Sequence, residues 1–222
     1  RALPVFLLVD TSGSMRGEKI ETVNIAVKEM LNAFKKIENP KGVIEICIIG
    51  FSDNKAEVIK PLSKISDADQ FTFSAEGNTP MGMAFSTVAE MIEDYNVVSK
   101  RAYTPTIILI SDGNPTDFTG YNSGMSDDAI CEWENLKRLQ SGARSAKAIR
   151  LAMGIGGDVD LRILKAFINN VSIPVIKAQD NDTIAKFFRW ATMSISVRSV
   201  SVNPDIPVLG DTDIFDKGEI EF

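Results

Sequence analysis

The sequence contains no histidine and only two cysteines in 222 residues. Without an imidazole, a Ser-His-Asp or Cys-His catalytic arrangement is excluded, and so is a zinc site with histidine ligands. The two thiols fall at Cys47, inside an apolar segment, and at Cys131, in a segment with a helical pattern. Two cysteines do not make the disulfide framework of small secreted domains, so we predict that both are free thiols.

Long hydrophobic runs and an excess of positive charge are also missing. No apolar run is long enough to span a membrane, and no signal peptide is visible at the N-terminus. The net charge of −6 and the pI of about 4.9 argue against nucleic acid as a partner, because phosphate binding needs a basic face. We therefore expect neither a membrane nor a nucleic acid as a partner. The chain starts at Arg1 rather than at a methionine, so this expectation covers only the residues present.

Strand and helix patterns alternate along the chain, which predicts an α/β fold. The alternation favours a doubly wound, mostly parallel sheet with helices on both faces. The segment 56–59 is short and polar, and we expect it to form one antiparallel edge strand. We predict one domain over residues 1–200 and a loosely packed C-terminal extension over 201–222, which is richer in Pro, Gly and Asp. The other expected strands cover 3–9, 43–51, 106–110, 148–154 and 173–176, and the expected helices cover 18–37, 80–95, 127–140, 159–169 and 181–196.

Oxygen-bearing side chains follow two of the predicted strands. Asp10, Ser12 and Ser14 come directly after the first strand, and Asp112 follows the strand over 106–110. A third hydroxyl, Thr79, precedes a predicted helix. In doubly wound sheets ligands bind at the carboxyl ends of strands, and hard oxygen donors suit a small hard cation. We predict a metal site built from these five residues, with Mg²⁺ as the expected ion and Mn²⁺ or Ca²⁺ as alternatives.

Each of these residues has an ordinary structural explanation when it is taken alone. Ser12 and Ser14 fit a Ser-Gly-Ser turn, Thr79 before Pro80 fits a helix N-cap, and Asp112 before a glycine fits a turn. Three such coincidences at the right strand ends favour the metal interpretation. Two other acidic residues near this edge, Asp53 and Asp117, are interpreted as turn residues or solvated loop charges rather than ligands.

These residues carry a family resemblance. The Asp-x-Ser-x-Ser sequence at 10–14, the distant Thr79 and the Asp-Gly at 112–113 resemble the metal-ion-dependent adhesion site of von Willebrand factor A domains. The resemblance implies that Ser12, Ser14 and Thr79 bind the ion directly. It implies that Asp10 and Asp112 act directly or through water, and that a partner protein adds an Asp or Glu side chain.

A narrower resemblance concerns the segments 3–15 and 111–117. Both segments are similar to the TerY family of bacterial tellurite-resistance A-domain proteins. This similarity implies a cytoplasmic protein of a tellurite-resistance or stress-response system. It also implies a protein phosphatase or a protein kinase of the same system as the partner.

Three functions remain open on the sequence, and we expect a metal-dependent protein-protein interaction module. The first alternative is a Mg²⁺-dependent phosphatase or hydrolase on a doubly wound sheet. Such an enzyme needs a second acid two residues after its aspartate, and Ser12 stands there, with a hydroxyl that cannot readily protonate a leaving group. We therefore expect that the protein is not an enzyme. The other alternative is an extracellular adhesion A domain, which shares the site but not the expected compartment.

Overall fold

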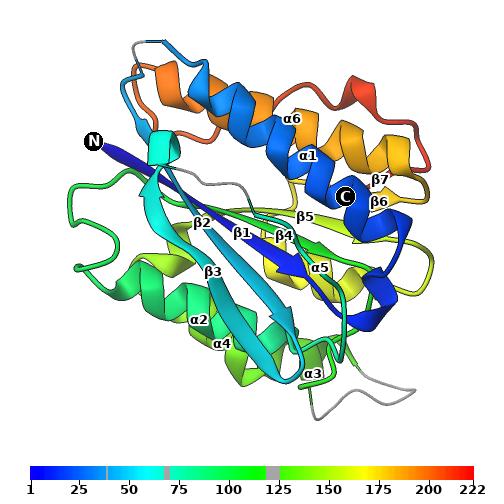
Figure 1. The fold of residues 1–222 in the computed structure, drawn as a ribbon. Coiled ribbons are helices and arrows are strands. Elements are labelled where there is room, and N and C mark those ends of the chain that lie inside the picture. Colours follow the sequence, from blue (N-terminus) through cyan, green and yellow to red (C-terminus); the bar gives the residue numbers. More distant parts are fainter. Residues whose placement is uncertain (39, 68–70, 119–125) are drawn as a thin grey trace.

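The protein folds around one seven-stranded sheet with the strand order β3-β2-β1-β4-β5-β6-β7. The computed structural model describes residues 1–38, 40–67, 71–118 and 126–222 (Figure 1). The five inner strands run parallel, and each edge strand pairs antiparallel with its neighbour. The strands are β1 (Ala2–Asp10), β2 (Val43–Ser52), β3 (Lys55–Lys64), β4 (Thr106–Ser111), β5 (Ile149–Ile155), β6 (Val175–Ala178) and β7 (Ile220–Glu221). The predicted fold class is confirmed, and β7 adds a second antiparallel edge that the sequence did not indicate.

Helices cover both faces of the sheet, as Figure 1 shows. On one face α1 (Glu18–Lys35) packs beside α6 (Asn181–Val200), and the apolar stripe of α1 is buried. The opposite face is covered by α2 (Met81–Glu93), α4 (Glu134–Ser141) and α5 (Leu161–Ile168). Every residue of β4 and all but the first residue of β1 are buried, as expected for central strands of a parallel sheet.

The prediction of one continuous helix over 127–140 is wrong. The structure has two short helices there, α3 (Asp127–Glu132) and α4, separated by Trp133. Trp133 has an extended backbone, with φ −61° and ψ 114°. Its indole packs against the rings of Phe85 and Phe118 with centroids 5.4 and 4.9 Å away. Burial of this large ring in the core stabilises the interrupted helix relative to a continuous one.

The sequence led us to expect a loosely packed segment after α6, but this segment packs against the domain. Phe215 is buried against Trp190 of α6, and the Trp190 indole N–H donates to the carbonyl of Gly210 at 2.9 Å. The chain then returns to the sheet, where β7 pairs with β6. Residues 201–222 therefore extend the core and the sheet of the domain.

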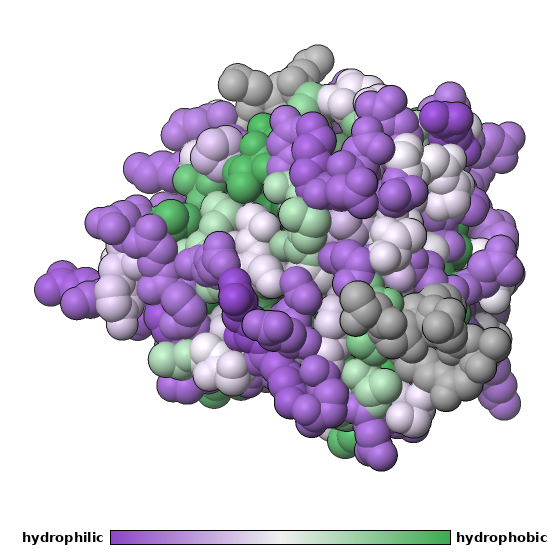
Figure 2. Space-filling view, turned by 90° about the horizontal axis from the view of Figure 1, so that it is seen from below, coloured by the Kyte–Doolittle hydropathy of each residue, from purple (hydrophilic) through white to green (hydrophobic). Residues whose placement is uncertain are grey.

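The surface offers little apolar area on the face seen from below in Figure 2. That face is mainly hydrophilic, and its hydrophobic residues lie in small separate areas. A large exposed apolar patch is the usual mark of a hydrophobic docking surface. In the described part of the chain no helix is long and apolar enough to cross a membrane.

The topology places two strand ends together. The strand order in the sheet changes direction at β1, because β1 pairs with β2 on one side and with β4 on the other. Val9 lies opposite Ile110 in the register, so Asp10 ends beside Ser111 and Asp112. In open α/β sheets such a reversal opens a crevice at the carboxyl ends of the strands. The predicted site residues lie at this crevice.

Candidate metal centre

Asp10 is fully buried at the end of β1 and is held from two sides. Its Oδ1 accepts a hydrogen bond from the backbone N–H of Ser12 at 2.8 Å. Its Oδ2 accepts one from the hydroxyl of Ser111 at 2.5 Å. The carboxylate is therefore oriented by one local and one long-range donor, and its orientation does not depend on the loop alone.

Burial changes the acidity of this carboxyl group. Desolvation raises the pKa of Asp10 from 3.8 to about 6, and the charge of Asp112 adds to this increase. The hydrogen bonds from Ser111 and Ser12 oppose the shift without cancelling it. A cation near the carboxylate favours its ionised form, so cation binding and loss of the Asp10 proton are coupled.

The two serines of the loop connect this residue to the second carboxylate. The hydroxyl oxygens of Ser12 and Ser14 lie 3.0 Å apart. The Ser14 hydroxyl also donates to Oδ1 of Asp112 at 2.7 Å. A hydroxyl group can rotate and can both donate and accept hydrogen bonds. A metal ion can therefore replace these hydrogen bonds.

Thr79 brings the third hydroxyl to the same place. The residue is buried, but its hydroxyl is open to solvent and has no hydrogen-bond partner within the described residues. A side chain on Gly113 would begin 3.4 Å from Thr79 Oγ1 and 3.9 Å from Ser14 Oγ. The glycine therefore leaves open the small space between these hydroxyls. Because hydroxyl and carboxylate oxygens gather around this space, and the Thr79 hydroxyl is open to solvent and engaged by no protein group, the residues present fit a divalent cation.

The structure thus brings together all five residues that the sequence singled out. Ser12, Ser14 and Asp112 are joined by hydrogen bonds, and the Thr79 hydroxyl lies beside Gly113 near Ser14. Asp10 joins them through Ser12 and Ser111. Over the described residues no group of three or more acidic or cysteine side chains is arranged to hold a metal. The candidate centre consists of three hydroxyls and only two carboxylates.

Two residues of the centre were missed from the sequence. Ser111, which holds Asp10, stands directly before Asp112, and its place at the end of β4 was the signal available. Lys19 of α1 had no such signal. Its ammonium lies 2.5 Å from Oδ2 of Asp112 and 3.4 Å from the carbonyl of Ser14. A protein cation therefore already contacts one carboxylate of the centre.

The second helix is capped differently from the expectation. Pro80, rather than Thr79, occupies the N-cap position of α2, and the Thr79 hydroxyl makes no capping bond. The carboxylate of Asp117 accepts hydrogen bonds from the backbone N–H groups of Gly82 and Met83 at 3.1 and 2.8 Å. Of the two interpretations of Asp117, a solvated loop charge or a turn residue, the first does not hold, because this loop carboxylate supplies the missing cap of α2. Its capping role leaves the Thr79 hydroxyl free for the centre.

The comparison with known families agrees with this geometry. The profile of the von Willebrand factor type A domain matches residues 5–190, which include all five residues of the candidate centre. The chain belongs to the von Willebrand factor type A family. No curated protein sequence matches the chain.

Solved structures show the same fold at low sequence identity. The von Willebrand factor domain of the type V pilus tip protein Mfa5 from Porphyromonas gingivalis superposes with a TM-score of 0.64 at 12% identity, over 96% of this chain and 99% of that one. The pilus adhesin SpaC from Lactobacillus rhamnosus GG gives 0.69 at 16% identity, over 90% of this chain. Proximal thread matrix protein 1 from the mussel byssus, with zinc in its metal-ion-dependent adhesion site, gives 0.59 at 16%, over 87% of this chain.

SpaC and the mussel protein are longer than this chain. It spans 31% of the SpaC chain and 47% of the mussel protein. In those proteins the A domain is one part of a longer polypeptide. These similarities show that the chain has the fold of an A domain. They do not assign the activities of the whole proteins to this chain.

Proposed function

We propose that this A domain binds a divalent cation at the candidate centre and recognises a partner protein through that ion. The observation that carries the proposal is the convergence of Ser12, Ser14 and Asp112 beside Gly113, where the Thr79 hydroxyl lies without a protein hydrogen-bond partner and open to solvent. Asp117 caps α2, so the hydroxyl is left for a ligand.

The charges of the centre favour recognition of an acidic side chain. A bound divalent cation supplies an electrophile for a carboxylate. Asp10 and Asp112 are the two carboxylates of the set, and together they just balance a 2+ charge. Ser12, Ser14 and Thr79 add oxygen ligands without adding charge, so an incoming Asp or Glu meets no excess of negative charge. Mg²⁺ keeps several waters in its shell, and a carboxylate replaces one of them.

We propose Mg²⁺ as the ion, with Mn²⁺ and Ca²⁺ as the alternatives. Hydroxyl and carboxylate oxygens are ligands of hard cations, and the chain contains no imidazole. The zinc in the adhesion site of the mussel protein belongs to that protein. It makes Zn²⁺ the necessary comparison in any titration of this chain.

The cellular setting is a separate proposal that depends on the resemblance to the TerY family. It consists of a bacterial tellurite-resistance or stress-response system, a cytoplasmic location, and a protein phosphatase or kinase as partner. The proposal that the chain is not itself an enzyme depends instead on Ser12, whose hydroxyl stands where a phosphatase of this kind needs a second acid. The segments 3–15 and 111–117 support the proposed cellular setting. Free thiols at buried Cys47 and exposed Cys131 are compatible with it. The similarity to the SpaC pilus adhesin favours the extracellular alternative.

Isothermal titration calorimetry tests the cation site. The wild type, Ser12→Ala and the matched control Ser172→Ala, at an exposed loop position, are titrated with Mg²⁺, Mn²⁺, Ca²⁺ and Zn²⁺. We expect one site in the wild type and the control, and at least a tenfold weaker site in Ser12→Ala. Unchanged affinity in a folded Ser12→Ala protein contradicts the assignment.

Recognition of a carboxylate through the ion has its own readout. Mn²⁺ bound with an open position keeps exchangeable water and raises the relaxation rate of the water protons. A glutamate-containing peptide that replaces this water lowers the rate, whereas the same peptide with glutamine leaves it unchanged. Equal effects of both peptides contradict the proposed mode of recognition.

A further inference from the structure

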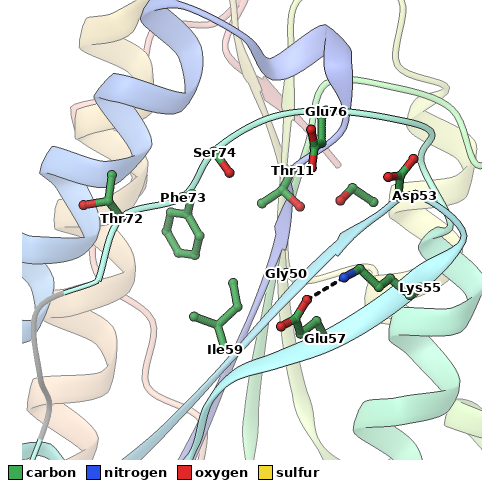
Figure 3. Close-up of a pocket in the computed structure, with 11 residues that line it drawn as sticks. Thr11, Gly50, Asp53, Lys55, Glu57, Ile59, Thr72, Phe73, Ser74 and Glu76 are labelled. Atoms are coloured by element: carbon green, nitrogen blue, oxygen red, sulfur yellow. Dashed lines mark hydrogen bonds and ion pairs between the residues drawn. The ribbon is translucent and has the colours of Figure 1, made fainter.

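A second feature lies directly beside the candidate centre, on the side of the edge strand β3. It is a basin of about 230 Å³ between the β2–β3 hairpin and the segment 72–76 (Figure 3). Thr11, which stands between Asp10 and Ser12, belongs to its lining. The basin is separate from the proposed metal site, and its lining contains none of the five residues of that site.

Backbone hydrogen bonds join the basin to the centre. The N–H of Glu76 donates to the carbonyl of Thr11 at 2.8 Å, and the N–H of Gly13 donates to the carbonyl of Gly77 at 2.9 Å. Glu76 and Thr79 are three positions apart, which places their Cα atoms at most about 11 Å apart. A single short peptide is therefore long enough to contact both places.

The lining carries an excess of negative charge. Asp53, Glu57 and Glu76 contribute three carboxylates, and Lys55 contributes one ammonium, which leaves a net charge of −2. Lys55 is already paired with Glu57 at 2.9 Å. Figure 3 shows the carboxylates of Asp53 and Glu76 beside the upper end of the basin, near Thr11.

Thr11 provides a second, independent sign of a ligand. The residue is 7% exposed, and its hydroxyl has no hydrogen-bond partner among residues that the structure describes and is open to solvent. The side chain points into the basin in Figure 3. A hydroxyl that opens into the basin beside acidic side chains, and that no protein group engages, is a ready acceptor for an N–H donor.

The shape of the basin favours an extended cation over a metal ion. Within the described chain no three carboxylates are close enough to hold one metal, so the acidic groups are spread along the wall. Ile59 and Phe73 add apolar lining between them. Lysine and arginine side chains match this combination, because an apolar stem carries a charged end with several donors.

We propose that this basin binds an arginine or lysine side chain of the partner, located within about three residues of the carboxylate that binds the metal. The inference rests on the proposed function, because the metal-bound carboxylate sets where the basic residue arrives. It adds a charge requirement that the metal centre alone does not impose. The recognised segment would then contain an acidic and a basic residue close together.

Selection from a displayed library of random heptapeptides tests this inference. Peptides are selected on the immobilised chain in Mg²⁺ and in EDTA. We expect the wild type in Mg²⁺ to enrich an acidic residue with Arg or Lys within three positions. Enrichment of the acidic residue alone overturns this inference and leaves the proposed function standing. No Mg²⁺-dependent enrichment of acidic residues overturns both.

Variants of the basin sharpen the same experiment. Asp53→Asn combined with Glu76→Gln keeps the side-chain shapes, and Asn tolerates the positive φ of 51° at position 53. We expect this variant to keep the acidic preference and to lose the basic one. Lys55→Gln removes the ammonium and should strengthen the basic preference. Glu29→Gln, at an exposed position on α1, is the matched control and should change nothing.

The size of the effect is measured on one selected peptide. Replacing its basic residue by alanine should weaken binding to the wild type about two- to fivefold, the range of exposed ion pairs. The same replacement should have no effect on the double variant. High salt should reduce the difference, because these charges are open to solvent. An equal loss in wild type and double variant means that the basic residue binds elsewhere and overturns the inference.

Discussion

The two ends of the inner strands both bury charge, but the charges differ in sign and in partners. At the carboxyl ends, the buried carboxylates are Asp10 and Asp112. At the amino ends, the buried cations are Arg150 of β5 and Arg198 of α6. Burial shifts the pKa of both guanidinium groups down to about 10, and it shifts the pKa of Asp10 up to about 6.

The partners show what distinguishes a structural charge from a functional one. Arg198 donates to the carbonyls of Pro204 and Thr104 and to the hydroxyl of Thr106, which ties α6 and the following segment to the start of β4. Backbone carbonyls are held by the fold and are not given up. The carboxylates at the other end are met mainly by hydroxyls and one lysine, which a ligand can replace. Exchangeable partners, rather than burial, mark the functional end.

The largest expected effect comes from breaking the structural end. Arg198→Ala leaves several buried oxygen atoms without donors, and we expect a loss of about 3 kcal/mol or more of unfolding free energy in urea denaturation. Arg189→Ala, at an exposed position on the same helix, should stay within about 0.5 kcal/mol of the wild type. Cation affinity of the folded Arg198→Ala protein should equal that of the wild type. A loss of cation affinity in that variant would contradict the separation of the two ends.

The pH dependence tests the carboxyl end. Between its unfolded value of 3.8 and its folded value of about 6, Asp10 holds a proton in the folded state that the unfolded chain has lost. In EDTA, Asp10 therefore adds up to about 3 kcal/mol to the free energy of unfolding at low pH. This contribution is lost as the pH rises through this window.

Other carboxylates titrate as well, so the pH profile of Asp10→Asn must be subtracted. Groups such as Asp160 and Glu93 have a lowered pKa and change stability in the opposite direction. The difference between the wild-type and variant profiles isolates Asp10. With Mg²⁺ present the difference should shrink, because a bound cation favours the ionised form. A flat difference profile in EDTA would show that Asp10 is not shifted.

A smaller effect is expected from the residue that orients Asp10. Ser111→Ala removes the hydroxyl that donates to Oδ2 of Asp10. Supporting contacts of metal ligands are typically worth 10- to 100-fold in affinity, and we expect a weakening of about that size in calorimetry. Ser172→Ala serves again as the control. If Ser111→Ala binds the cation as tightly as the wild type, Asp10 does not need this orientation.

The smallest effect concerns the protein cation at the centre. Lys19 contacts Asp112, so it competes with a metal ion for the same carboxylate. Lys19→Met keeps the apolar stem and removes the charge, and we expect cation affinity to rise by up to about fivefold. Lys28→Met, an exposed position on the same helix, should have no such effect. A weaker cation site in Lys19→Met would mean that Lys19 supports the centre instead of competing with it.

Much of the fold follows from local pattern. The strands over 3–9, 43–51 and 106–110 lie within one or two residues of β1, β2 and β4, because central parallel strands are apolar on both faces. The antiparallel edge strand was also predicted, although β3 is longer than the segment 56–59. The break at Trp133 was not predicted, since it depends on rings from distant segments.

The sequence by itself determined the chemistry of the centre: which residues carry oxygen, and that they follow strands whose ends meet at one edge. Only the tertiary structure decided which partner each residue has. Lys19 reaches Asp112, Ser111 holds Asp10, and Asp117 caps α2 in place of Thr79. These contacts join residues that lie from 35 to 101 positions apart. Spacing along the chain carries local geometry, whereas contacts at such separations are set by how the layers pack.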